Sequence, residues 1–116
     1  MWELDSNRPI YLQIAEKIEL EICSGVYQPG DKIPSVRELA QEAGVNPNTM
    51  QRALTELERK KIIITFRTSG RIVTEEKERI QEIRNNLAKE QIRGFLEKMW
   101  EMGFDKKEVL RLLKED

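Results

Sequence analysis

The chain has 116 residues, of which 35% are charged and 39% hydrophobic, and its formal net charge is −1. This length suits one ordinary domain, or one small domain with an appendage. The chain contains no histidine, so the commonest general base and the commonest zinc ligand are both absent. The remaining residues form no catalytic constellation, metal-spaced cluster or phosphate-binding glycine loop. We therefore expect no enzyme activity, no metal and no cofactor.

The same sequence argues against secretion and membrane insertion. No apolar run approaches the ~20 residues that cross a bilayer, and the first residues lack a signal-peptide pattern. A cytoplasmic protein without a membrane partner is expected. The single cysteine, Cys23, lies in an apolar-periodic stretch, which favours a buried inert thiol over a redox role.

Positive charge is concentrated in one part of the chain. Residues 1–45 contain four basic and eight acidic side chains, and residues 72–116 are close to neutral. Residues 46–71 contain six basic side chains against two acidic ones: Arg52, Arg59, Lys60, Lys61, Arg67 and Arg71 against Glu56 and Glu58. A basic patch on an otherwise neutral chain is typical of phosphate binding, although charge runs are more often solvated faces.

The first helix is expected to begin at Pro9. An apolar stripe follows at helical spacing, and Gly25 is expected to cap its end. The stripe comprises Tyr11, Ile14, Ala15, Ile18 and Ile22, whereas Glu16, Lys17, Glu19 and Glu21 are assigned to other faces. After a turn over residues 28–31, residues 32–34 are too short for a full strand but could pair at a sheet edge.

Residues 35–61 contain two helical patterns separated by a tight turn. Ser35 and Glu38 predict a capping box at the start of the first helix, and Gly44 suits the left-handed residue that ends it. Asn46 and Pro47 restart a helix that is expected to run to about residue 61. Two helices joined by a short turn containing Gly form a helix-turn-helix, whose second helix enters the DNA major groove.

The second of these helices has two different faces. Its inner stripe is apolar and comprises Met50, Ala53, Leu54 and Leu57. The opposite face carries Asn48, Arg52, Thr55 and Arg59. Because Asn can pair with adenine and Arg can grip guanine, this face is predicted to read bases.

A β-hairpin is predicted directly after this helix. Residues 62–66 and 71–74 are the expected strands, and residues 67–70 are the expected turn. A hairpin in this place is the wing of a winged helix-turn-helix. Its Arg67 and Arg71 side chains would contact a phosphate backbone or the minor groove of DNA. The alternative is a hairpin that only covers the core.

Residues 75–116 are predicted to form a helical tail. One long helix is expected over residues 75–102, where Gly94 leaves open either a break or a close helix crossing. A short helix follows, with Asp105 and Glu108 as its capping box. The broad apolar face of the long helix is predicted to pair two copies of the chain: Ile80, Ile83, Leu87, Ile92, Phe95, Leu96 and Met99. The alternative is a tail that folds onto its own chain.

Over residues 9–74 the sequence resembles the GntR superfamily of bacterial transcription regulators. The resemblance rests on Pro9-Ile10-Tyr11, Gly25-Val26-Tyr27, residues 29–35, Arg37-Glu38-Leu39-Ala40, residues 44–49, Arg52-Ala53 and Leu57-Glu58. The short tail resembles that of the YtrA-like branch, whose reduced C-terminal helices mainly dimerise. The implied fold is mainly α (α+β). It has a winged helix-turn-helix DNA-binding domain over residues 1–74, and the two helices of residues 75–116 form a dimerisation tail.

The resemblance also implies which residues contact DNA. Ser35 and Arg37 would hold phosphates at the start of the first helix of the helix-turn-helix. The groove-facing positions are Asn46, Asn48, Thr49, Gln51 and Arg52, and the wing tip comprises Thr68, Ser69 and Gly70. Two positions depart from the family pattern. Pro47 stands where other branches often have a basic residue, and the wing lacks a second Gly and an aromatic residue near Ile72.

The expected function is sequence-specific regulation of transcription, acting as a repressor. A homodimer would bind a pseudo-palindromic operator with half-sites about one helical turn apart. The alternative is a winged-helix module for protein–protein contact that binds no DNA. The sequence leaves open whether a small-molecule effector exists.

Overall fold

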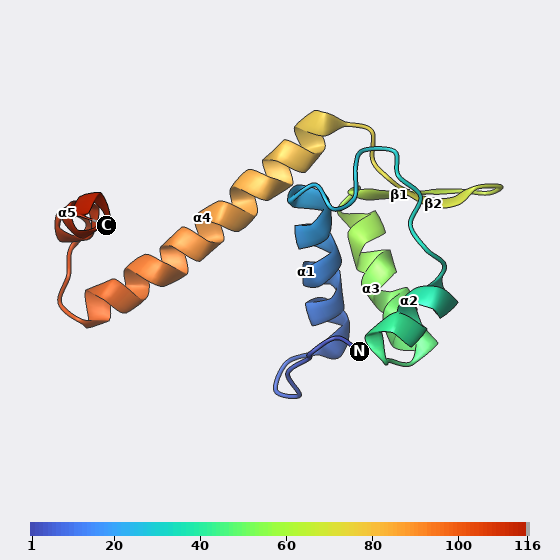
Figure 1. Cartoon of the computed structure of the whole chain (residues 1–116), viewed down its shortest axis with the longest axis horizontal. Coiled ribbons are helices and arrows are strands. Elements are labelled where there is room, and N and C mark those ends of the chain that lie inside the picture. Colours follow the sequence, from blue (N-terminus) through green and yellow to red (C-terminus); the bar gives the residue numbers. More distant parts are fainter. Residues whose placement is uncertain (116) are drawn as a thin grey trace. The chain divides into compact units, whose positions relative to one another are not determined.

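The computed structural model describes residues 1–115. These residues form five helices and one antiparallel pair of strands (Figure 1). In chain order the elements are α1 (Ile10–Cys23), α2 (Val36–Ala43), α3 (Pro47–Arg59), β1 (Ile63–Phe66), β2 (Gly70–Val73), α4 (Lys77–Glu101) and α5 (Lys106–Glu115). The predicted winged helix-turn-helix with two C-terminal helices is confirmed. The chain divides into two compact units, one of residues 1–82 and one beginning at Ile83.

The core of the first unit lies between its three helices. Both α1 and α2 pack against α3, and α1 and α3 run side by side in Figure 1. The inward side chains of the predicted stripes are buried: Ile14, Ala15, Ile18, Ile22, Leu39, Ala40, Met50, Ala53, Leu54 and Leu57. Tyr11, which was placed in the same stripe, is only half-buried.

Local capping bonds define the helix-turn-helix. The Glu38 backbone N donates to Ser35 Oγ at 3.2 Å, and the Ser35 backbone N donates to Glu38 Oε1 at 3.3 Å. Gly44 ends α2 with φ 75°, and Asn46 Oδ1 accepts from the Asn48 backbone N at 2.7 Å. The predicted caps are therefore confirmed. Helix α3 ends at Arg59, slightly earlier than expected. Lys61 adopts a left-handed conformation, with φ 62°, before the chain enters β1.

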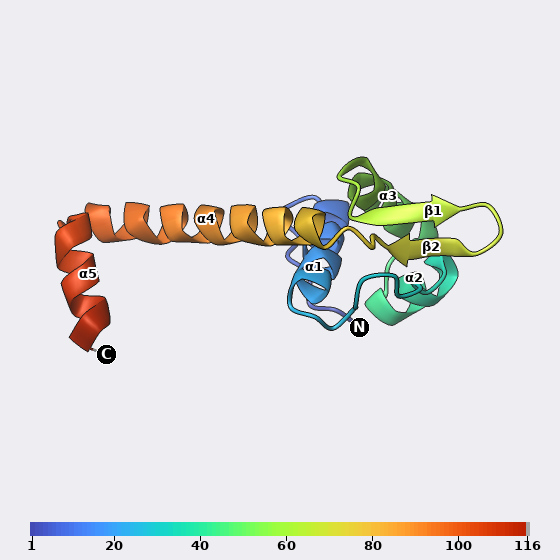
Figure 2. The same cartoon turned by 90° about the horizontal axis from the view of Figure 1, so that it is seen from above.

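The sheet is the predicted hairpin with one additional short pairing. In the ladder Ile63 is opposite Val73 and Phe66 is opposite Gly70. Lys32 forms an isolated bridge with Ile72, and the Ile33 backbone N donates to the Arg71 carbonyl at 2.9 Å. Figure 2 shows the hairpin turn projecting away from the helices of this unit.

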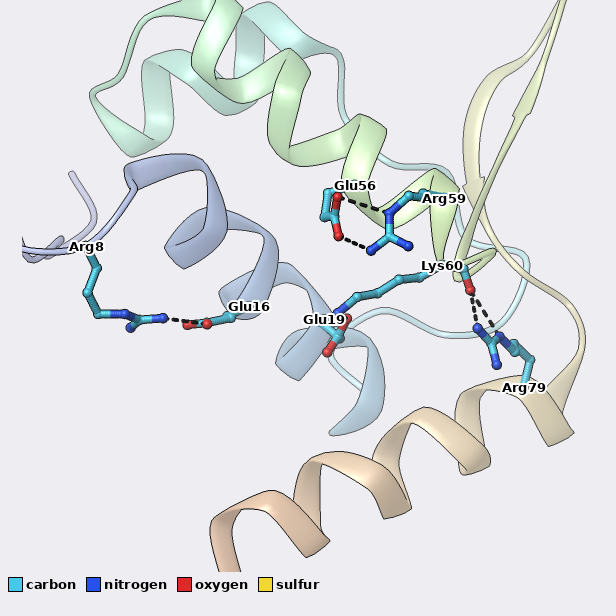
Figure 3. Close-up of polar contacts among 7 residues, drawn as sticks. All are labelled: Arg8, Glu16, Glu19, Glu56, Arg59, Lys60 and Arg79. Carbon is cyan, nitrogen blue, oxygen red and sulfur yellow. Dashed lines mark hydrogen bonds and ion pairs between the residues drawn. The ribbon is translucent and has the colours of Figure 1, made fainter. Parts of the chain in front are cut away.

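Glu19 corrects one expectation from the sequence. It was assigned to an outer face of α1, but it is only 2% exposed. Lys60, at the end of α3, places its Nζ 3.0 Å from Glu19 Oε2 (Figure 3). The buried face of α1 is therefore wider than its stripe of apolar residues. The paired ammonium offsets part of the cost of burying the carboxylate.

Helix α4 begins on the first unit. Arg79 Nε and Nη2 both donate to the Lys60 carbonyl, at 3.0 and 2.7 Å (Figure 3). This fork attaches the first turns of α4 to the end of α3. These bonds lie within the compact unit of residues 1–82.

The second unit contains the rest of α4 together with α5. Helix α4 passes through Gly94 without a break, and the space that a Cβ would occupy there is open. The capping box before α5 is confirmed, because the Glu108 backbone N donates to Asp105 Oδ1 at 2.9 Å and the Asp105 backbone N donates to Glu108 Oε1 at 3.1 Å. Val109 is buried, whereas Leu110, Leu112 and Leu113 are exposed.

Candidate nucleic-acid interface

The first turn of α2 presents an unpaired cation and free backbone donors. Arg37 is exposed, and no carboxylate lies within ion-pair distance of it in residues 1–115. The Ser35 hydroxyl accepts the capping bond but can still donate to another oxygen. Backbone N–H groups at a helix N-terminus favour anions. This geometry suits the phosphate contact predicted for Ser35 and Arg37.

The first two turns of α3 present the predicted reading face. Asn48, Gln51 and Arg52 are exposed, and Thr49 is half-buried. The Asn46 side-chain oxygen accepts the capping bond, so its two amide N–H donors and one lone pair of the oxygen remain for another partner. Gln51 Nε2 lies 3.3 Å from Thr55 Oγ1 along the same face.

Helix α1 contributes to this face in a way that the sequence analysis missed. The Arg52 guanidinium carbon lies over the Tyr11 ring, 3.8 Å from its centroid. A shallow hollow at this place is lined from both helices by Pro9, Ile10, Tyr11, Asn48, Thr49 and Arg52. Tyr11, an aromatic residue two positions after Pro9, was the available signal, but its helical spacing with the apolar stripe made it look like a core residue.

The wing separates into an exposed tip and an anchored base. Arg67, Thr68, Ser69 and Gly70 are exposed, and part of the tip lines a groove with Ser35 and other residues at the start of α2. The Arg71 side chain is only 19% exposed, and its Nε lies 2.9 Å from Glu58 Oε1. Thr65 Oγ1 donates to the other oxygen of Glu58 at 2.7 Å. Glu58 therefore ties both strands of the wing to α3.

Fewer cations are available to a ligand than the basic stretch of residues 46–71 suggested. Arg59 pairs with Glu56, Lys60 with Glu19, and Arg71 with Glu58 (the first two pairs are drawn in Figure 3). Within the described residues, four cations of the winged unit lie outside any carboxylate's ion-pair distance and either belong to the predicted DNA contacts or line the groove beside them: Lys32, Arg37, Arg52 and Arg67. Three of these belong to the predicted DNA-binding set.

The Glu58 carboxylate is held in its charged form. Burial raises its pKa, but hydrogen bonds from Thr65 and Arg71, with the Arg71 charge, outweigh burial and leave the pKa below its ordinary value of 4.5. A carboxyl whose folded-state pKa is depressed stabilises the fold above its ordinary pKa. That contribution is lost as the pH falls below 4.5 and through the folded-state value.

Glu58→Gln is expected to lower the free energy of unfolding by about 1 kcal/mol at pH 7, after allowance for partial exposure. The loss should shrink at pH 3, where the wild-type carboxyl is also protonated. Urea unfolding at the two pH values measures both effects. Glu56→Gln is the matched control on the same helix and should cost clearly less, because the arginine of that pair, Arg59, is 68% exposed whereas Arg71 is 19% exposed. An equal cost at both pH values would contradict the role given to the charge.

Comparison with known proteins places this interface in a family. The model "Bacterial regulatory proteins, gntR family" matches residues 10–73. The chain belongs to the GntR family. The matched segment contains α1, the helix-turn-helix and the wing, so every predicted DNA-contact residue lies inside it. Regulators of transcription, and not enzymes, are the relatives of this chain.

Individual GntR-family members resemble both units. The HTH-type transcriptional repressor YtrA of Bacillus subtilis is 43% identical over 93 residues, which cover 78% of this chain and 71% of that protein. A GntR family transcriptional regulator from Listeria monocytogenes superimposes with a TM-score of 0.90 at 42% identity, covering 97% of this chain and 99% of the other. The DNA-binding domain of AraR in complex with operator ORX1 matches 64% of this chain and 90% of its own, with a TM-score of 0.56 at 29% identity.

No group of three or more potential metal-ligating side chains is present among residues 1–115. Over the same residues, no helix combines the length and apolar character that crossing a membrane requires.

Proposed function

We propose that two copies of this chain bind a pseudo-palindromic operator and repress transcription from it. The observation that carries the proposal is the exposed start of α3, where Asn48 and Arg52 stand free for base edges. Unpaired Arg37 and Arg67 lie on the neighbouring α2 and wing. In this arrangement α3 would enter the major groove, Arg37 would hold a phosphate, and the wing tip would contact the adjoining backbone or minor groove.

The similar proteins support DNA as the partner. The AraR domain that matches 64% of this chain is in complex with an operator, and YtrA of Bacillus subtilis is a repressor. Because operator DNA in bacteria lies in the cytoplasm, we expect the protein to act there.

The tail is proposed to pair the two copies. Ile92 is 56% exposed, Phe95 43% and Trp100 74%, and Leu113 on α5 is 57% exposed. Large apolar side chains exposed together on one compact unit are costly to leave in water, and such exposure is typical of a protein–protein contact. Ile83 is already buried within its own chain. The proposed contact is therefore centred on the part of the predicted dimer face from Ile92 onwards, together with Trp100 and α5.

Selection of bound fragments from random DNA tests the function directly. A pseudo-palindrome with half-sites about one helical turn apart is expected, with affinity that falls steeply as salt rises. Absence of binding to any fragment at low salt would favour the alternative, a protein-interaction module. Reporter expression with and without the protein then distinguishes repression from activation.

Arg37→Ala should weaken binding to the operator and to unrelated DNA by a similar factor. A phosphate contact carries no sequence information, so the base preference should stay unchanged. The slope of log affinity against log salt concentration should become shallower by about one, because one fewer counterion is released. Binding titrations over a range of salt concentrations measure both quantities. Arg84→Ala, which removes an exposed arginine from α4, is the matched control and should change neither. A selective loss for the operator would show that Arg37 reads bases.

A further inference from the structure

We infer that Tyr11 is a positioning residue for base recognition, acting through Arg52. The inference rests on the proposed function and deepens it, because it names what holds the reading arginine in place. The aromatic ring that lies against Arg52 comes from the first turn of α1, outside the helix-turn-helix. Its face supports the guanidinium that is assigned to a base.

The geometry of the pair is that of a stacked cation and ring. The distance of 3.8 Å from the guanidinium carbon to the ring centroid is well inside the limit of about 6 Å for such an attraction. The planar guanidinium can stack on an aromatic face while its N–H donors remain free at its edges. Stacking therefore leaves available the donors that a guanine requires.

The surroundings of Arg52 explain why this support matters. Arg52 is exposed, and no carboxylate of residues 1–115 lies within ion-pair distance of it. A long side chain with no other support samples many rotamers and loses that freedom when it grips a base. Because the Tyr11 ring already restricts the Arg52 side chain, less conformational entropy is lost when Arg52 binds a base. By contrast, Arg59 on the same helix is restrained by Glu56.

Tyr11 is also placed for this role and not only for packing. It is half-buried, whereas Ile14 and Ile18 of the same helix are fully covered. With Pro9 and Ile10 it lines the hollow that Asn48, Thr49 and Arg52 line from the other side. The exposed part of its ring thus belongs to the predicted DNA-facing surface.

The test compares three full-length variants with the wild type on the selected operator. Tyr11→Leu should weaken operator binding about 2- to 5-fold and reduce the preference at the base that Arg52 reads. Tyr11→Phe keeps the ring and should restore both values. Tyr27→Leu removes the chain's other tyrosine from outside the hollow and should leave base preference unchanged.

A double-mutant cycle separates positioning from a general loss of structure. In an Arg52→Ala background, Tyr11→Leu should cost clearly less affinity than in the wild type. An equal cost in both backgrounds would overturn the inference. Tighter binding by Tyr11→Leu would also overturn it, because the ring would then be holding Arg52 away from the DNA.

An observation on the free protein keeps the inference separate from the proposed function. The Arg52 side-chain protons should show upfield NMR shifts from the Tyr11 ring, present in Tyr11→Phe and absent in Tyr11→Leu. If these shifts are absent from the wild type, the inference fails even though the operator is bound. If they are present but no DNA is bound specifically, the proposed function fails instead.

Discussion

A chain that ends after Glu82 is expected to be monomeric and to bind the operator about 10²–10⁴-fold more weakly than the full chain. In a dimer, binding of the first winged unit places the second beside its half-site at high effective concentration. Residues 1–82 keep the core and the Arg79 bonds to the Lys60 carbonyl, so the winged unit should stay folded. Analytical ultracentrifugation and operator titration measure the two effects.

A point variant tests the same surface in the full chain. Phe95→Glu places a charge on the exposed apolar part of α4 and should shift the chain towards monomer. Asn86→Glu adds the same charge at an exposed polar position on the opposite face of α4 and is the matched control. Dimers of residues 1–82, or full-strength dimers of the Phe95 variant, would show that pairing occurs through another surface.

Arg52→Ala is expected to cost about 1–3 kcal/mol in operator binding and to relax preference at one base pair. The cost comes from losing a two-donor contact to a base edge and should be larger for the operator than for unrelated DNA. Titration of the operator and its single-base variants at one fixed salt concentration measures it.

Arg59→Ala provides the comparison for Arg52. Both arginines were assigned to the outer face of α3, but the Arg59 guanidinium is paired with Glu56. The Arg59 variant should therefore leave base preference almost unchanged. If Arg52→Ala keeps the full operator preference, the reading face has been assigned to the wrong side of α3.

Local features of the fold were predictable because their causes lie within a few residues. Each capping box joins residues three positions apart, and the left-handed turn at Gly44 needs only a residue without a Cβ. The continuity of α4 at Gly94 was not predictable in the same way. A single Gly costs only about 0.5–1 kcal/mol in a helix, which a long helix can absorb.

The residues of the candidate site were predictable from the sequence. Which of their charges remain unpaired in the folded chain was not. The sequence placed Arg52, Lys60 and Arg71 in one basic stretch with equal weight. In the folded chain Lys60 neutralises Glu19, which lies 41 residues earlier, and Arg71 pairs with Glu58, 13 residues earlier. The periodicity of the sequence does not predict such pairs, because they form only where elements distant in sequence meet.

The sequence by itself determined the helix-turn-helix, the wing and the face of α3 that carries Asn48 and Arg52, since caps, turns and helical period are local. Tertiary structure alone decided which cations remain free, how Glu58 anchors the wing, and that Tyr11 supports Arg52. The physical reason is that charge pairing and ring stacking depend on distances of a few ångströms. Those distances are set by the packing of α1 and the wing against α3.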